Sequence, residues 1–417
     1  MFSGSATSTS RVGSDVGFDE FRSEGQGDTV KPANGVLSSF GTTIFEVMSR
    51  LAIEHEAVNL GQGFPDGNGP DDVRAIAHGA LDDPPNQYPP MMGVPELRRA
   101  IAAHDKRFYG IDADWQSETM VASGATEVLA SALFGLLEPG DEIVMFEPLY
   151  DSYIPIARRA GAQVKLVRLR PPDWEIPMDQ LAAAFGPKTK AILINSPLNP
   201  AGKVFDRVEL EAIANLVLQH DAYAICDEVY EHIVFDGIAH VPLMTLPGMR
   251  ERCVRIASAG KTFSLTGWKV GYATAAPEVL APIAKAHQFL TFTTPPNLQR
   301  AVAFGLAKDD RYFRSLRDQM QASRDRLASG LKEIGFGVAP CNGTYFLNAD
   351  FRPLGFDGTD EQFCQHITTE AGVAAVPVSA FYVGDNDVPA HFARFCFCKE
   401  NRTLDEAVRR LSDHFRA

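Results

Sequence analysis

Residues 191–230 read AILINSPLNPAGKVFDRVELEAIANLVLQHDAYAICDEVY. This stretch contains two short, almost wholly apolar runs, at 191–194 and 222–226, separated by a helix-like span at 208–219. A strand that is apolar on both sides predicts a position under helices on both faces of a sheet, as in a parallel sheet built from strand–helix–strand units. The unit therefore predicts an α/β fold.

The same alternation extends over most of the chain. Helical spacing occurs at 73–81, 96–108 and 126–137. Five further apolar runs bring the number of expected strands to seven: 120–122, 142–146, 164–169, 253–257 and 270–273. We expect an α/β large domain, with a seven-stranded, mostly parallel sheet flanked by helices.

The pattern changes at about residue 300. Helices are expected at 309–333, 361–370 and 404–415, mixed with strands at 344–348, 373–377 and 393–397, which indicates a smaller α+β domain. We divide the chain into a disordered N-terminal arm (1–35), a segment that packs with the small domain (36–65), the large domain (66–299) and the small domain (300–417). The arm is rich in Ser, Gly, Thr and acidic residues, which disfavours a packed core.

Composition excludes several classes of function. The net charge of −14 over 417 residues disfavours nucleic acid or an anionic membrane as a partner. No apolar run approaches the ~20 residues of a membrane helix, and no apolar segment suits a secretory signal, so we expect a cytoplasmic protein. Cys396 and Cys398 lie two residues apart on one strand; because further ligands are missing nearby, we favour buried thiols in a reducing compartment over a metal or redox pair.

Polar residues close several of the predicted strands. In open α/β sheets, ligands bind beyond the carboxyl ends of the strands, where Ser123-Gly124, Glu147-Pro148, Asn195, Asp227 and Ser258 are expected. Each of them alone is better explained as a strand end or a helix cap. Their recurrence at five strand ends favours a ligand site.

Lys261 carries the most specific chemistry. It lies in SAGKTFSLTGWK (258–269), where small residues deliver a lysine into a turn, and Lys269 follows eight residues later. A lysine desolvated beside a second cation loses its proton more readily and can form a Schiff base. The alternative is two solvated surface lysines, but the neighbours Phe263, Trp268 and Val270 are poor surface residues.

Asp227 and Arg394 are charged residues in apolar strands. A carboxylate in a dry crevice requires a cationic partner, such as a protonated pyridine nitrogen or Mg²⁺; no GxxxxGK[ST] loop supports the second, and no metal site is predicted. Arg394 requires a carboxylate, either from a substrate or from an internal salt bridge. The Gly124-Ala125 turn at a helix start suits a phosphate, although capping explains it equally well.

Seven segments together resemble the fold-type I, class I aminotransferases, which depend on pyridoxal 5′-phosphate, and in particular the kynurenine/glutamine transaminase and bacterial methionine aminotransferase branch. The resemblance runs from about residue 40 to the C-terminus. The segments are VNLGQGFPD (58–66), NQYPPMMG (86–93), FEPLYDSY (146–153), DEVYEHIVFDG (227–237), SAGKTFSLTGWKVGY (258–272), GTYFL (343–347) and RFCF (394–397).

The resemblance implies a role for each matching residue. Lys261 would bind the cofactor and move protons, and Asp227 would pair with the pyridinium nitrogen. Tyr230 and Asn199 would bond the phenolic oxygen, and Tyr150 would stack on the ring. The remaining implied roles are phosphate binding by Gly124, Ala125, Ser258, Lys269 and the partner's Tyr88; carboxylate binding by Arg394, Asn199 and Gly63; and a side-chain pocket of Phe45, Phe292 and Tyr345.

The resemblance also implies a homodimeric, ping-pong transaminase that moves an amino group from an L-amino acid to a 2-oxo acid. The apolar and aromatic pocket residues favour methionine, an aromatic amino acid, glutamine or kynurenine as the donor. Two alternatives keep the cofactor: a cysteine-conjugate β-lyase and a succinyl-diaminopimelate aminotransferase. A regulator built on this fold is disfavoured, because residues 1–35 are too short and polar for a DNA-binding module.

Overall fold

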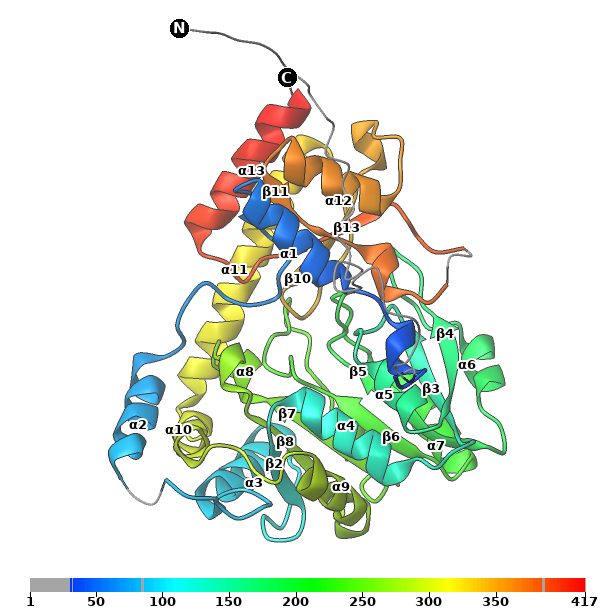
Figure 1. The fold of residues 1–417 in the computed structure, drawn as a ribbon, viewed down its shortest axis with the longest axis vertical. Helices are drawn as coiled ribbons and strands as arrows, with labels where there is room; N and C mark the ends of the chain where they lie inside the picture. Colours follow the sequence, from blue (N-terminus) through cyan, green and yellow to red (C-terminus); the bar gives the residue numbers. More distant parts are fainter. Residues whose placement is uncertain (1–30, 32, 84–85, 385–386, 417) are drawn as a thin grey trace, which may run out of the picture. The chain divides into compact units, whose positions relative to one another are not determined.

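The predicted apolar runs form one seven-stranded sheet in the computed structural model of the chain, which describes residues 31, 33–83, 86–384 and 387–416 (Figure 1). The strand order is β2-β8-β7-β6-β5-β3-β4. In this sheet β8 runs opposite to the other strands, because it pairs antiparallel with both β2 and β7. The bounds are β2 (Thr119–Ala122), β3 (Glu142–Glu147), β4 (Gln163–Arg168), β5 (Thr189–Asn195), β6 (Tyr223–Asp227), β7 (Cys253–Ser258) and β8 (Gly271–Ala275). The prediction of a mostly parallel seven-stranded sheet is confirmed.

Alternate residues of these strands face opposite layers of helices. In β3, Ile143 and Met145 join one core cluster, whereas Val144 and Phe146 join another. The first cluster packs under α4 (Ala125–Leu136), α5 (Tyr153–Arg159) and α9 (Pro277–Leu290), and the second packs under α6 (Met178–Ala184) and α7 (Arg207–Gln219). Figure 1 shows α4 and α9 side by side against the sheet. Burial on both faces explains why the strands are nearly all apolar.

A third cluster closes the β2–β8 end of the sheet. It joins Val121, Ala257 and Tyr272 to the apolar faces of three helices, which are α2 (Asp71–Asp82), α3 (Pro95–Tyr109) and α10 (Pro296–Leu306). The predicted boundary between the two domains, at 299/300, falls inside α10. Residues 41–417 form one compact unit, so the division into a large and a small domain stays a prediction.

The C-terminal part of the chain adds a four-stranded sheet in the order β12-β13-β10-β9. Its strands are β9 (Gly337–Val338), β10 (Phe346–Asp350), β12 (Val376–Pro377) and β13 (Phe392–Cys396), and its helices are α11 (Asp310–Ile334), α12 (Asp360–Thr369) and α13 (Asn401–Arg416). An aromatic-rich core, with Phe351 and Phe363 stacked at 4.1 Å, fills the space between them. Helix α12 begins with a capping box at Thr359 and Gln362, which satisfies its first free N–H groups.

The segment before the large sheet reaches this second core. Helix α1 (Ile44–Glu54) packs on α12, and β1 (Val58–Asn59) pairs in parallel with β11 (Val373–Ala374). Residues 31 and 33–40 belong to a separate unit with a short 3₁₀ turn at Leu37–Ser39. The predicted arm (1–35) lies almost wholly outside the described residues. No helix among the described residues has the length and apolarity that a membrane span requires.

Candidate active site

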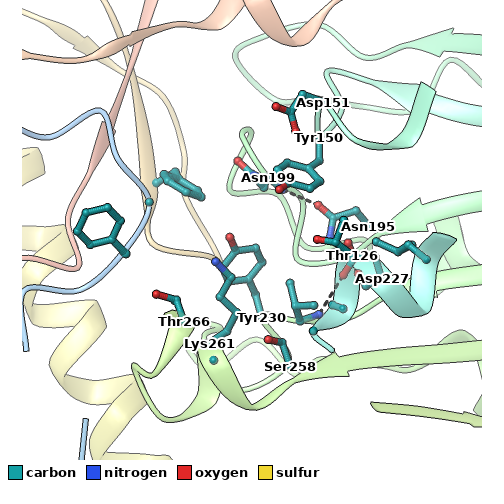
Figure 2. Close-up of a pocket in the computed structure, with 18 of the residues that line it drawn as sticks. Thr126, Tyr150, Asp151, Asn195, Asn199, Asp227, Tyr230, Ser258, Lys261 and Thr266 are labelled. Carbon is teal, nitrogen blue, oxygen red and sulfur yellow. Dashed lines mark hydrogen bonds between the residues drawn. The ribbon is translucent and has the colours of Figure 1, made fainter. Parts of the chain in front are cut away.

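A cavity of about 510 Å³ lies at the carboxyl ends of β5, β6 and β7 (Figure 2). Lys261 enters it from α8 (Ala259–Thr262), which follows β7 directly, and Asp227 enters it from the end of β6. Most of the residues singled out from the sequence line this cavity: Phe45, Gly63, Gly124, Ala125, Tyr150, Asn199, Asp227, Tyr230, Ser258, Lys261, Lys269 and Arg394. Segments more than 300 residues apart in the chain therefore meet in one site.

The Lys261 side chain is half-buried, and its amine is hydrogen-bonded to one tyrosine and lies near a second. Its Nζ donates a hydrogen bond to the Tyr345 hydroxyl at 2.7 Å, and that hydroxyl donates to the Gly63 carbonyl at 2.7 Å. The ring of Tyr230 lies 5.6 Å from Nζ. Burial lowers the pKa of Lys261, because the charged ammonium is poorly solvated in the cavity. The amine is therefore closer to its neutral, nucleophilic form than a surface lysine.

Asp227 is a buried carboxylate that forms no ion pair with any residue in the described part of the chain. It is 5% exposed, and its donors are the Tyr153 hydroxyl at 2.5 Å and, more weakly, the Val229 amide at 3.4 Å. Burial raises the pKa of Asp227 to about 6, and the bond from Tyr153 limits the rise. No lysine, arginine or histidine nitrogen among the described residues lies within 4.0 Å of it. A cation that entered the cavity beside Asp227 would remove this desolvation cost.

Arg394 is likewise buried without a counter-ion. It is 1% exposed, its Nη1 donates to Asn199 Oδ1 at 3.0 Å, and its Nη2 donates to the Gly61 carbonyl at 2.8 Å. Its Nε has no hydrogen-bond partner, and burial lowers the pKa of Arg394 to about 10. Because no carboxylate among the described residues lies within 4.0 Å, the internal salt bridge considered from the sequence is absent from that part of the chain. A ligand carboxylate would give the Nε of Arg394 a hydrogen-bond partner and the guanidinium a counter-ion.

Two asparagines connect the strand ends to this arginine. Asn195, at the end of β5, donates from Nδ2 to the Asp227 carbonyl at 2.9 Å and accepts at Oδ1 from the Asn199 amide at 2.8 Å. Asn199 in turn holds Arg394. The loop predicted from the SPLNPAG sequence thus places one amide side chain between the sheet and the C-terminal core.

The start of α4 forms a cradle with Lys269. Gly124 precedes the helix at φ +87°, and a Cβ at this position would meet the Lys269 side chain at 3.1–3.3 Å. A Cβ on Gly271 would meet the Ala125 amide nitrogen at 2.4 Å, so the backbone packs too closely there for any side chain. Free N–H groups at the start of a 12-residue helix, with an ammonium beside them, attract an anion.

Three of the predicted residues lie outside the cavity lining. Tyr345 contacts the site through its hydroxyl, which accepts the hydrogen bond from Lys261 Nζ at 2.7 Å. Tyr88 is 83% exposed and contacts Phe292 edge to face at 5.6 Å.

Two of the polar strand ends are structural, because Glu147 pairs with Arg168 at 2.7 Å and Ser123 bonds Thr294 at 3.1 Å.

The sequence reasoning missed Tyr153, which bonds Asp227, and also missed the Gln62, Phe64 and Phe346 wall of the cavity. Tyr153 lies three residues after Tyr150 in FEPLYDSY, and this spacing was its only signal. Nothing in the sequence distinguishes a tyrosine that bonds a carboxylate 74 residues away from one that packs in a core.

A second group of titratable residues lies away from the cavity. Arg255 on β7 is buried between Asp105 at 2.7 Å, Glu228 at 2.8 Å and Glu231. Burial by itself raises the pKa of Glu231, but Arg255 and two histidines lower it to about 2. His104 and His232 face each other through their Nε2 atoms at 2.8 Å, the distance of an N–H···N bond. Glu228 and Glu231 flank Asp227 and Tyr230 in sequence, so this group anchors the loop that carries them.

Comparison with known proteins identifies the family. A family model described as aminotransferase class I and II matches residues 55–411. The chain is 46% identical to a probable N-succinyldiaminopimelate aminotransferase of Mycobacterium tuberculosis, over 90% of this chain and 97% of that protein.

The chain belongs to the class I and II aminotransferases.

Two further similarities support the same family. This aminotransferase is 40% identical to the methionine aminotransferase of Escherichia coli, over 90% of this chain and 96% of that protein. The solved structure of an N-succinyldiaminopimelate aminotransferase from Mycobacterium tuberculosis superposes with a TM-score of 0.89, covering 92% of this chain and all of that one. The predicted family and enzyme class are confirmed.

Aminotransferases of this family use pyridoxal phosphate, and the residues of this cavity suit that cofactor. The unpaired carboxylate of Asp227 matches a pyridinium nitrogen, the amine of Lys261 matches an aldehyde, and the α4 cradle matches a phosphate. These residues thus supply one partner each for the ring nitrogen, the aldehyde and the phosphate of the cofactor.

Proposed function

We propose that this aminotransferase moves the amino group of an L-amino acid of the methionine, aromatic, glutamine or kynurenine type to a 2-oxo acid by a ping-pong mechanism. The class of amino donor is inferred from the aromatic residues around Arg394. Phe346, Phe381 and Phe45 surround the guanidinium at 3.9, 4.8 and 5.2 Å from their ring centroids. An arginine for one carboxylate, set among aromatic rings, suits a substrate with an uncharged side chain.

In this proposal, Lys261 both holds the cofactor and transfers the proton. When bound, pyridoxal phosphate supplies the electron sink that stabilises negative charge at the substrate Cα. Burial keeps the Lys261 amine available as a base for the Cα proton, and Tyr345 keeps the side chain aimed into the cavity. The same nitrogen would then deliver the proton to the cofactor, so that Lys261 acts first as a base and then as an acid.

Asp227, Tyr230, Asn199 and Tyr150 would position the cofactor ring. Asp227 would hold the ring nitrogen in its protonated form, since the carboxylate gains a cation that it lacks in the free cavity. Tyr230 and Asn199 would donate to the phenolic oxygen, and Tyr150 would cover one face of the ring. All four line the cavity from strand ends or the loops that follow them, which favours a fixed orientation.

The α4 cradle would hold the cofactor phosphate. Gly124 and Ala125 would provide backbone N–H groups, Ser258 a hydroxyl and Lys269 an ammonium. Arg394, Asn199 and the Gly63 backbone would bind the α-carboxylate of the substrate, with Phe45, Phe292 and Tyr345 around its side chain.

We further propose that the enzyme is a homodimer in which Tyr88 and Phe292 reach the partner's site. Tyr88, between α2 and α3, is 83% exposed and contacts Phe292, which follows α9; Phe289, near the end of α9, is 82% exposed. Exposed aromatic side chains of this size are typical of interfaces. The cytoplasmic location expected from the sequence stays a prediction.

N-succinyldiaminopimelate is the second candidate donor, favoured by the 46% identity to the Mycobacterium tuberculosis protein. Besides the α-carboxylate beside the reacting amine, this donor carries two further carboxylates, which require further positive charge. Among the described residues that line the cavity, Arg394, Lys261 and Lys269 are the cations, and each already has a proposed partner. A residue from a partner subunit would have to supply the missing charge, so we place this donor second.

A panel of amino acids tests the proposal. Each donor is added to the purified, cofactor-loaded protein without an oxo acid, and conversion of the bound cofactor to its aminated form is followed by absorbance. Methionine, aromatic amino acids, glutamine or kynurenine should convert it. Conversion only by N-succinyldiaminopimelate would select the second candidate, and conversion only by aspartate would contradict both.

A further inference from the structure

Two buried thiols touch at the end of the strand that carries Arg394. Cys396 is the last residue of β13 and Cys398 follows two residues later, with their Sγ atoms 3.2 Å apart. Both side chains are buried. Arg394 and Cys396 are two apart within β13 and point to the same side of it, and the sulfur of Cys398, just after the strand, contacts that of Cys396. This contact was not expected from the sequence, where the pair was interpreted as two inert buried residues.

One of the two thiols borders a second cavity that is distinct from the proposed active site. Cys398 lines a cavity of about 670 Å³ between the loop 65–70 and helix α11, together with Lys399 and Met320. Lys261 lines the other cavity and not this one. A small solute that enters the second cavity would approach the pair from the Cys398 side.

The surroundings favour a thiolate at Cys396 and a neutral thiol at Cys398, whose pKa burial raises well above its ordinary range. Lys399 follows Cys398 directly, and its Nζ lies 3.1 Å from Asp66 and donates to the Phe64 carbonyl at 2.8 Å. Burial raises the pKa of Cys396, but the hydrogen bond from Cys398 and the charges of Lys399 and Arg394 outweigh burial and lower it. A thiolate that accepts a hydrogen bond from a second thiol is the arrangement from which disulfides form.

We propose that Cys396 and Cys398 are an oxidisable dithiol, which hydrogen peroxide or a similar small peroxide converts to a disulfide in the folded protein. The Cys396 thiolate attacks a peroxide oxygen, the O–O bond breaks, and hydroxide leaves and takes a proton to form water. The second thiol then attacks the sulfenic acid, and a second water leaves as the S–S bond forms. Two thiols are oxidised by two electrons and one peroxide is reduced to two waters.

The required movement is small. A disulfide bond is about 2.05 Å long, so the sulfurs must approach by roughly 1.2 Å from their present contact. Cys398 lies beyond the end of β13, where the backbone is free of the strand ladder. Movement is resisted at Cys396, whose amide donates to the Leu60 carbonyl at 2.7 Å. Cys398 is therefore the residue that moves.

Oxidation would act on the proposed substrate site through the 60–66 segment. Cys396 holds Leu60, Lys399 holds Phe64 and Arg394 holds Gly61, and this segment supplies Gln62, Gly63 and Phe64 to the cavity wall. This step rests on the proposed function. We expect a higher KM for the amino donor, by up to about 100-fold for a displacement near 1 Å, with cofactor absorbance unchanged.

The chain contains a matched internal control. Cys226 and Cys253 are a second pair of neighbouring buried thiols, on the adjacent strands β6 and β7. Neither of them lines the two cavities. If oxidation followed only from two thiols being close together, this pair would oxidise as well.

The test is thiol mapping of the cofactor-loaded wild-type protein after treatment with hydrogen peroxide. Free thiols are alkylated and the protein is digested with trypsin, which releases residues 395–399 as one peptide. We expect this peptide to lose two hydrogens and escape alkylation, with full reversal by dithiothreitol, while Cys226, Cys253, Cys341 and Cys364 remain alkylated. Alkylation of both thiols in 395–399, or disulfide formation in both pairs, would overturn the proposal.

Two variants separate the chemistry from its effect. Cys398→Ala should prevent the loss of two hydrogens, whereas Cys364→Ala, a buried cysteine of the same core, should leave it intact. A disulfide without any change in KM would overturn the coupling to the substrate site. If no amino acid reacts at all, the proposed function fails, while the mass measurement still decides on the dithiol.

Discussion

Replacing Asp227 with Asn should stabilise the cofactor-free protein while impairing the enzyme. The carboxylate has a pKa of about 6 in the folded protein, against an ordinary value of 3.8. A difference of about two pKa units corresponds to about 3 kcal/mol by which folding disfavours the ionised form. The group is buried throughout, so solvent screening does not reduce this figure appreciably.

The sign of the effect follows from proton binding. Between pH 4 and 6 the folded state keeps its proton on Asp227 while the unfolded state loses it, so the unfolding free energy falls as the pH rises. Above pH 6 the folded protein bears the full free-energy cost of the ionised Asp227 carboxylate. Asn does not titrate, so the stability of Asp227→Asn relative to the wild type should grow by about 1.4 kcal/mol between pH 5 and pH 8.

Denaturant titration of both cofactor-free proteins at pH 5 and pH 8 measures this difference. In the loaded enzyme the same substitution should lower transamination by at least about 100-fold, because the ring nitrogen loses its charged partner. A stability difference that is independent of pH, or that favours the wild type at pH 8, would refute the claim that Asp227 is an uncompensated buried charge.

Three further substitutions test separate parts of the site. Arg394→Ala should raise the KM for the amino donor by about 10- to 100-fold, the value of one charge-assisted contact, with cofactor binding retained in an absorbance titration. Tyr153→Phe removes the bond that limits the rise of the Asp227 pKa, so the acid limb of the pH–rate profile should move to higher pH; an unmoved limb would contradict this. Arg255→Ala leaves three buried carboxylates without their cation, and the unfolding free energy should fall by about 3–5 kcal/mol in denaturant titration, against little change for the exposed control Arg158→Ala.

Local sequence patterns predicted the large sheet because burial on both faces leaves a strong signal. Each of the seven apolar runs overlaps an observed strand, and β5, expected at 191–194, extends over Thr189–Asn195. The direction of β8 could not be predicted, because an antiparallel strand buried on both faces has the same composition as a parallel one. The helices α9 and α10 were missed, although Pro277 and Pro295-Pro296 mark where they begin.

The site was predicted where chemistry is unusual and missed where it is ordinary. A lysine among small residues and an arginine in an apolar strand are rare enough to single out Lys261 and Arg394. Tyr153 was missed, and Tyr345 was expected only in the side-chain pocket; both are common core residues, and only the fold shows that their hydroxyls reach Asp227 and Lys261. The contact between Cys396 and Cys398 also depends on how the chain bends after β13, which spacing alone does not reveal.

The central claim is that the cofactor is attached through one particular lysine. Lys261 and Lys269 both line the cavity, so either could in principle carry it. Borohydride reduction of the loaded protein fixes the bond, and peptide mapping by mass spectrometry then locates the pyridoxyl group. Our account predicts that group on Lys261 alone; finding it on Lys269 or on another lysine, or finding no reducible bond, would contradict it.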